Sequence, residues 1–410
     1  MSGGWRWAAV TALLAGAITA CQERLTSPAE CPALCPGGSA AVFDTVVTAR
    51  QSLDSSYVGY VGRGSGTALL LSTDGFPPSD DRAIYKFAAR GDSVSVRDTL
   101  RSYTVDSVTF GLNLVARDTL VTGLKIYLYR LPSSVDSTST FADIDPQLNP
   151  ATLIDSIVVP DSVHKGSVIT VVRSGTPGLA QVTLPPGGDS VLAIGLKLAA
   201  ASPTGIRLGS LTSSSAALFT SYVTADVPDT GAARHPALSR GTVFNTFVTQ
   251  NPLVPVDSLL TVGGEPSSRA LVRFGLTSGF LDSATIVRAT LELTPVRPIL
   301  GLPSDPSIIQ ALAVIGDIGA KSPLTQDLTQ VRQDTLPTVQ SDTLRMEITN
   351  IVRLWQSSRA RPQSIFLRLA PEAATFARAQ FFSTRSHAGD TLVAPRLRIT
   401  YQRAFSFETP

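Results

Sequence analysis

Histidine and glutamate, which enzymes often use for acid–base chemistry, are scarce in this sequence of 410 residues. The 3 histidines are His164, His235 and His387, and none stands in a motif with a nucleophile and an orienting carboxylate. A glycosidase needs two carboxyl groups at one cleft, but Glu292 alternates with leucines and is expected to point outward from a strand. The sequence therefore predicts no catalytic residue, no cofactor and no enzymatic activity.

Aspartate recurs in one short motif, Asp-Ser or Asp-Thr followed by Val, Ile or Leu, for example at Asp44, Asp106 and Asp257. An aspartate that accepts a hydrogen bond from its own backbone closes a turn, and the aliphatic residue then begins a strand. A calcium site is the less favoured alternative, because no such aspartate belongs to a loop of alternating carboxylates ending in a bidentate glutamate. We therefore predict turns here and no metal site.

Two tyrosines are candidates for ligand binding. Tyr127 and Tyr129 stand two residues apart in an alternating pattern, so they share one face of a strand with Lys125. Two rings on one face can stack on a sugar or accept a peptide. The alternative is that this face meets the other half of the chain or a loop.

Arginine is concentrated near the C-terminus. From Arg353 to Arg403 there are nine arginines but only two acidic residues. The outward positions Arg396 and Arg398, together with Arg368, are predicted to form a stripe that binds carboxylates or phosphates through forked hydrogen bonds. A solvated strand face, or a face that docks the acidic first half of the chain, is the alternative.

The elements that must position these residues are almost all strands. Short alternating segments with regular turns fill the chain, and the one good helix candidate is 350–358, with Ile351, Leu354 and Trp355 on one face. Trp355 is expected to fill a core rather than to bind a ligand. We predict an all-β fold of two tandem antiparallel β-sandwiches of jelly-roll type, after a signal peptide and a flexible tether.

An internal repeat supports two domains. The segment 42–48 is similar to 243–249, and 82–87 is similar to 269–274. The predicted organisation is a signal peptide over 1–20, a lipidated cysteine and tether over 21–40, a first sandwich over 41–226, a linker over 227–240, a second sandwich over 241–403 and a tail over 404–410.

The N-terminus has the layout of a secretory signal, with Arg6 before an apolar run and small residues before Cys21. Ile-Thr-Ala-Cys resembles the lipobox of bacterial lipoproteins, which implies acylation of Cys21 and anchoring in a membrane. Gln22 in the next position implies the outer membrane, on its periplasmic or its surface side. Cys31 and Cys35 are predicted to form a local disulfide.

Blocks in the second half resemble the DNRLRE-type domain, a jelly-roll sandwich of secreted and surface-attached bacterial proteins that often binds carbohydrate. The similar blocks are Arg269–Phe274, Ala289–Leu293, Glu347–Trp355, Phe381–Arg385 and Pro395–Tyr401. The resemblance covers roughly 240–403 and implies a β-sandwich there and a more distant copy over 41–226.

The charge composition excludes one class of function, nucleic-acid binding. A formal net charge of +2 provides no field that would attract nucleic acid. We therefore expect a non-catalytic, lipid-anchored envelope protein whose sandwiches bind or organise surface polysaccharide. The alternative is a structural or assembly lipoprotein that contacts other envelope proteins through its faces or edge strands.

Overall fold

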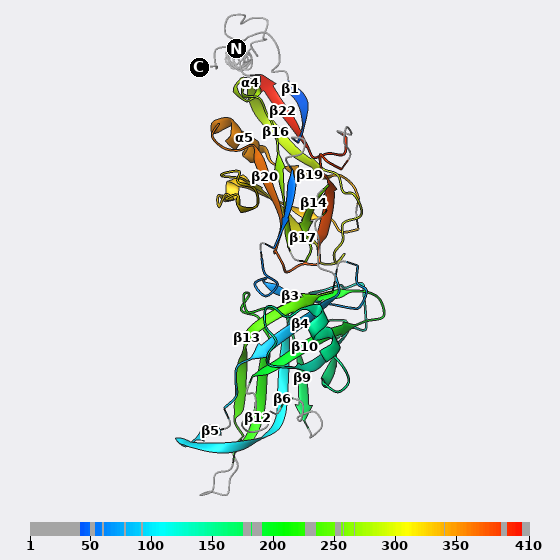
Figure 1. Ribbon diagram of the computed structural model, residues 1–410, viewed down its shortest axis with the longest axis vertical. Helices are drawn as coiled ribbons and strands as arrows, with labels where there is room; N and C mark the ends of the chain where they lie inside the picture. Colours follow the sequence, from blue (N-terminus) through cyan, green and yellow to red (C-terminus); the bar gives the residue numbers. More distant parts are fainter. Residues whose placement is uncertain are drawn as a thin grey trace, which may run out of the picture.

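The computed structural model describes residues 42–403 except 50–53, 60, 78, 92, 175–181, 183–190, 226–234, 251–255, 257, 266, 340 and 387–391. These residues form two β-sandwiches stacked end to end in an elongated molecule (Figure 1). All strand pairs are antiparallel in the part described. The predicted all-β sandwich fold is thus confirmed. Cys21, Cys31 and Cys35, with the predicted lipidation and disulfide, lie outside the described residues.

The N-terminal domain contains eleven strands in one continuous sheet that folds back on itself. Its elements are β3 (Ala68–Ser72), β4 (Asp81–Phe87), β5 (Ser93–Val96), β6 (Thr99–Arg117), β7 (Lys125–Leu131), α2 (Phe141–Ile144), η1 (Asp145–Gln147), β8 (Leu153–Val158), β9 (Ser167–Ser174), β10 (Leu192–Ala199), β11 (Gly205–Gly209), β12 (Leu218–Ala225) and β13 (Ala237–Thr249).

The long strand β13 joins the two layers of this domain. Its first part pairs with β12, and after a register shift near Thr242 its second part pairs with β4. The core between the layers contains Phe87 on β4, Phe110 on β6 and Phe219 on β12, with the ring centroids of Phe87 5.7 Å from those of the other two. Alternation along β6 places one residue set in this core and the other on the outer face.

The C-terminal domain packs a four-stranded sheet, β1-β22-β16-β19, against a seven-stranded sheet around β17, β20 and β15. Its elements are β1 (Val42–Thr48), β2 (Ser55–Val58), β14 (Leu259–Gly263), β15 (Ser268–Arg273), α4 (Ser278–Ser283), β16 (Ala284–Leu293), β17 (Ser307–Ala313), η2 (Gly319–Lys321), η3 (Leu328–Gln330), β18 (Val331–Leu336), β19 (Leu344–Glu347), α5 (Thr349–Ser357), β20 (Ser364–Ala370), β21 (Arg378–Phe382) and β22 (Arg396–Arg403).

The predicted helix is present as α5, and its apolar face enters the core of the C-terminal domain. Trp355 is 1% exposed, and its ring centroid lies 6.3 Å from that of Phe274. Trp355 therefore packs as predicted, inside the domain and away from any ligand.

The domain boundaries differ from the predicted ones. Strand β1 pairs with β22 over all seven of its residues, and β2 pairs with β15, so 42–58 belong to the C-terminal domain. Strand β13 belongs to the N-terminal domain, whereas the predicted organisation places its residues in the linker and the second sandwich. The N-terminal domain is therefore inserted between β2 and β14 of the other domain. Alternation predicted that these segments are strands, but it carries no information about which sheet pairs with them.

Side-chain hydrogen bonds hold β2 in the seven-stranded sheet of the C-terminal domain. The Ser56 hydroxyl donates to the Leu259 carbonyl at 3.1 Å and accepts from the Thr261 amide at 2.8 Å, so it bridges to β14. Just before β2, the fully buried Asp54 carboxylate accepts the Thr384 amide at 2.8 Å and the Thr384 hydroxyl at 2.7 Å. These bonds attach the N-terminal segment to residues 203 to 330 positions later in the chain.

The two domains also share a packed junction. The Phe376 ring enters the core of the N-terminal domain, where it meets Phe76 edge to face at 5.3 Å. Arg207 extends the other way and forms hydrogen bonds with Asp305 at 2.8 Å and with the Ala374 carbonyl at 3.1 Å. Gly205 permits the approach, because a Cβ atom there would lie 2.6 Å from the Phe376 ring. The domains are thus joined by two chain crossings and by side chains that each inserts into the other.

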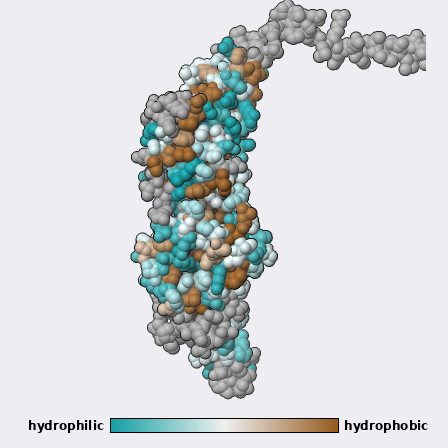
Figure 2. Space-filling model, turned by 90° about the vertical axis from the view of Figure 1, so that its right-hand side faces the viewer, coloured by the Kyte–Doolittle hydropathy of each residue, from teal (hydrophilic) through white to brown (hydrophobic). Residues whose placement is uncertain are grey.

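The surface mixes polar and apolar residues. Charged residues make up only 16% of the chain, and Figure 2 shows hydrophilic and hydrophobic patches interspersed along one face of both domains. No helix among the described residues is long and apolar enough to cross a membrane.

Asp54→Ala is expected to destabilise the C-terminal domain by about 1–3 kcal/mol, because the buried Thr384 amide loses its acceptor. Thermal unfolding of the chain from Gln22 onward measures this as a lower melting temperature. Asp44→Ala is the matched control, since Asp44 accepts one exposed hydrogen bond from Thr400. Equal stability of the two variants would contradict the assigned role of Asp54.

Candidate ligand-binding surfaces

The predicted tyrosine pair lies on the outer face of the N-terminal domain. The Tyr127 and Tyr129 ring centroids are 6.4 Å apart with the planes tilted by 31°, and the Lys125 ammonium lies 4.9 Å from the Tyr127 centroid. All three side chains are half-buried, and Tyr129 packs against the small cluster around α2. Burial raises the pKa of the Tyr129 hydroxyl. A loop segment thus covers part of this face, and ligand binding by the pair stays a prediction.

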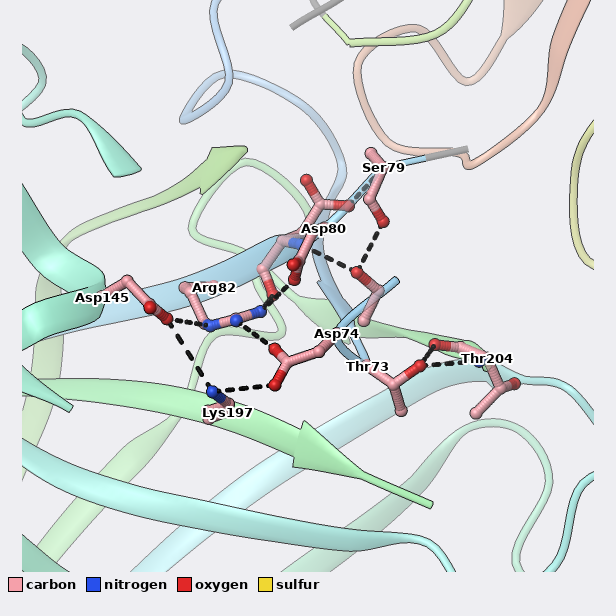
Figure 3. A network of polar contacts seen from close by, with 10 residues as sticks. Thr73, Asp74, Ser79, Asp80, Arg82, Asp145, Lys197 and Thr204 are labelled. Carbon is pink, nitrogen blue, oxygen red and sulfur yellow. Dashed lines mark hydrogen bonds and ion pairs between the residues drawn. The ribbon is translucent and has the colours of Figure 1, made fainter. Parts of the chain in front are cut away.

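A charged network holds the covering segment in place (Figure 3). Arg82 on β4 has a side chain only 1% exposed, and it binds Asp80, Asp74 and Asp145 at 2.5, 2.5 and 2.9 Å. Lys197, which is opposite Tyr127 in the sheet, adds an ion pair to Asp74 at 3.1 Å.

The network connects three parts of the domain. Asp74 comes from the turn after β3, Asp145 from η1, and Arg82 from the sheet beneath them. Partial burial raises the pKa of Asp74, but the hydrogen bonds and charges of Lys197 and Arg82 outweigh it and lower that pKa overall. For Asp80, burial outweighs the Arg82 charge and raises the pKa. We interpret the network as a structural clamp beside the tyrosines.

A second charged centre lies on the outer face of the four-stranded sheet of the C-terminal domain. Glu292 on β16 is opposite Arg345 on β19 and opposite Arg396 on β22. Its carboxylate lies 3.6 Å from Arg345, 2.9 Å from Arg396 and 3.3 Å from Arg398. Glu292 does point away from the core as predicted, but it is only 3% exposed because these arginines cover it.

An open groove of about 330 Å³ runs beside this centre, between β18 and the sheet face. We call it the arginine groove. It is lined by Arg288, Thr290, Glu292, Arg332, Asp334, Arg345, Glu347 and Arg398. Arg345 and Arg288 are about two-thirds exposed, with side-chain exposures of 66% and 63%, so their guanidinium groups are accessible from solvent.

The structure brings two of the three predicted arginines together. Arg396 and Arg398 share one face of β22, whereas Arg368 lies on β20 in the other sheet, where it bonds Gln310 at 2.7 Å and Glu372 at 3.4 Å. The prediction of one stripe containing Arg368 is wrong, because outward positions on the two layers of a sandwich face opposite directions.

Sequence reasoning missed Arg288, Arg332 and Arg345 as partners of Arg398 in the groove. Arg288 and Arg345 meet Arg398 through the register of β16, β19 and β22. Arg332 lies on β18, an edge strand of the other sheet, and joins them at the groove. One signal was present in the sequence, because an acidic residue flanked by leucines on a strand invites basic residues on the neighbouring strands.

Acid–base groups are not assembled into a triad in the described residues. The His235 side chain is 68% exposed, with Nδ1 2.9 Å from the Thr224 hydroxyl, and His164 is an exposed loop residue. His387 lies outside the described part. Glu292 and Glu347 both line the arginine groove, where they bind arginines as counter-ions. Within the same ranges, no group of three or more His, Cys, Asp or Glu could hold a metal ion.

Two carboxyl groups are buried near the domain junction. Burial raises the pKa of Asp81 to about 7, although hydrogen bonds from Ser79 and Thr249 and the Arg82 charge oppose the shift. Burial also raises the pKa of Glu265 well above its usual range; the Asp81 charge adds to the shift and Arg63 opposes it. Their location suits a structural role, because neither side chain reaches the surface.

Fold and surfaces together define a two-domain, all-β sandwich protein with polar outer faces. No known family model matches the chain, so the resemblance to the DNRLRE-type domain stays a prediction. No curated protein matches it either. Among solved structures, a similar chain is the N-terminal CBM22-1–CBM22-2 tandem domain of Xyn10C from Paenibacillus barcinonensis, with 10% identity and a TM-score of 0.13, covering 90% of this chain and 100% of that one. At this TM-score the comparison carries no argument about ligands.

The buried Asp81 predicts a pH dependence. Its folded pKa lies above the usual value of 3.8, so its contribution to stability is complete below about pH 4 and is lost as the pH rises towards 7. The loss amounts to about 4 kcal/mol. Denaturant unfolding from pH 4 to 8 should therefore show a flatter profile for Asp81→Asn than for the unchanged chain.

Asp136 provides the control for this experiment. Hydrogen bonds from Thr138 lower its pKa, so Asp136→Asn should change the profile only at the acid end. Identical profiles for Asp81→Asn and the unchanged chain between pH 5 and 8 would refute the prediction.

Proposed function

We propose that this chain is a non-catalytic, lipid-anchored envelope protein that binds an acidic polysaccharide in the arginine groove. The supporting observation is the groove itself, because Arg288, Arg332, Arg345 and Arg398 line an open volume of about 330 Å³. Arginine forks match carboxylates in geometry, so a polymer of uronic acids is the ligand class that fits.

The groove has four arginines and three carboxylates, Glu292, Asp334 and Glu347, so one positive charge remains for an added anion. A guanidinium group has about five N–H donors, whereas one carboxylate offers about four acceptor positions. Glu292 is shared by Arg345, Arg396 and Arg398, so most of their donors remain for water or a ligand. Glu292 also holds these arginines in place before a ligand arrives, which reduces the entropy lost on binding.

The shape of the site favours a polymer over a small anion. The groove is open to solvent rather than enclosed, so it can accept one part of a longer chain. An exported protein anchored at Cys21 would meet acidic polysaccharide as an abundant polyanion of the envelope. The rival function, an assembly lipoprotein that contacts proteins, does not need exposed arginines converging on one groove.

Retardation in gels that contain alginate or polygalacturonate tests this function. The chain from Gln22 to Pro410 is expected to be retarded, and the double variant Arg345→Ala/Arg398→Ala should bind at least about tenfold more weakly, since each charge-assisted hydrogen bond contributes about 1.5–3 kcal/mol. Binding by the unchanged chain should weaken at higher salt, because exposed charges are screened.

Arg359→Ala is the matched control, since Arg359 pairs with Asp282 near α4 and does not line the groove. Equal retardation of the double variant and this control would exclude the groove as the binding site. If no acidic polymer retards a folded sample, the assembly role is favoured and capture of envelope partners becomes the next experiment.

The proposed anchor has a separate test. Cys21→Ser should move the protein from the membrane fraction to the soluble fraction, because the acyl chains supply the attachment. Fractionation of cells that express both forms measures the shift. An unchanged membrane pool of Cys21→Ser would refute anchoring while leaving the groove unaffected.

A further inference from the structure

A second groove, of different chemistry, lies on the outer face of the N-terminal domain. It has a volume of about 440 Å³ and crosses strands β9, β6 and β12. Along β6, the outward residues Thr109, Gly111 and Asn113 alternate with core residues and form the floor. Because these floor residues are small, the face is hollowed where bulkier outward side chains would fill it. We call this the hydroxyl groove.

The sides of the hydroxyl groove combine hydroxyl groups with exposed apolar surface. Thr170 comes from β9, and Ser214 and Ser215 from the turn before β12. Tyr222, Leu218 and Val168 also line it, and they are 41%, 49% and 67% exposed. Among the described residues, no charged side chain lines this groove, in contrast to the arginine groove.

Several polar groups in the hydroxyl groove are available to a ligand. Within the described residues, the side chains of Thr109, Asn113 and Thr170 have no hydrogen-bond partner. The hydroxyl of Thr220, by contrast, already bonds Ser239 on β13 at 2.9 Å. The floor therefore offers donors and acceptors side by side, at the spacing set by the strand pairs Gly111–Thr170 and Asn113–Val168.

We propose that the hydroxyl groove binds a neutral polysaccharide. A sugar chain presents hydroxyl groups at its ring edges and C–H groups on its faces, which match the uncharged polar floor and the exposed Tyr222, Leu218 and Val168. A charged ligand would find no counter-charge among the described residues of the lining. A partner that adds a β-strand could not pair with β6 or β12, because both are paired on each side, and among the strands of the groove only β9 has a single partner in the described residues.

This site is independent of the arginine groove, since it lies in the other domain and has different chemistry. The proposal of a neutral-polysaccharide site rests on the proposed function in one respect, because the envelope location brings the protein into contact with polysaccharides. Together the two grooves would allow one molecule to bind an acidic and a neutral polymer at once.

Gly111→Val tests the site by filling its floor. A Cβ atom at Gly111 would lie 3.5 Å from Val168 and 3.8 Å from the Leu218 carbonyl, which are ordinary contacts, and the β-branched side chain suits a strand. Gel retardation with soluble xylan, β-glucan and mannan is the measurement. We expect the unchanged chain to be retarded by at least one of them, equally at two salt concentrations, and Gly111→Val to lose at least about tenfold in affinity.

Tyr222→Ala is the second variant, because its exposed ring can be removed without opening the core, and it should also weaken retardation. Gly91→Val is the matched control, since Gly91 lies in a loop outside the groove and a Cβ atom there meets only Ser93 at 3.6 Å. If both groove variants are retarded as strongly as the control, the proposed site is wrong. It is also wrong if no neutral polymer retards the unchanged chain. Gly111→Val should be retarded by alginate as strongly as the unchanged chain, because the arginine groove lies in the other domain. This comparison tests the arginine groove separately from the hydroxyl groove.

Discussion

The pairing of β1 and β2 with strands of the C-terminal domain is the constraint on which the rest of the structure depends. Seven residue pairs join β1 to β22, and the short β2 lies against β15 with a serine bridge to β14. Because the chain begins in one sandwich, crosses to the other and returns, the domains are joined twice. The junction can then bury Phe376 and Arg207, which a single flexible linker would not hold in register.

Charge is used sparingly, and the buried charges act as organising centres. In the N-terminal domain one arginine gathers three aspartates, and in the C-terminal domain one glutamate gathers three arginines. Burying an ion is costly unless several partners satisfy it, so each centre fixes the elements that supply those partners. The first centre fastens η1 over the sheet, and the second spreads arginines along a groove. A central arginine with aspartates around it thus forms a buried clamp in one domain, and a central glutamate with arginines around it forms an open charged surface in the other.

The sequence patterns predicted the elements better than their partners. Alternation indicated the strands, and the spacing of Ile351, Leu354 and Trp355 predicted α5 and its buried face. The destination of 42–58 could not be predicted, because a strand's pattern specifies a buried face but not the neighbour that pairs with its edges. Arg368 was misplaced for the same reason, since both layers have outward positions. The two grooves depend on register between strands distant in sequence, as for Arg345 and Arg396 beside Glu292.

The position of β1 also determines how tension would pass through an anchored molecule. Strand β1 begins, and β22 ends, at the end of the C-terminal domain far from its neighbour (Figure 1). A pull on the N-terminal domain would travel from a tethered N-terminus along the covalent chain of β1 and β2. A pull on the arginine groove would instead reach the tether by shear across the hydrogen bonds between β1 and β22, which would share the load along their whole length. Two ligands held by one molecule would therefore be restrained by different mechanical elements, one a continuous chain and the other a ladder of hydrogen bonds.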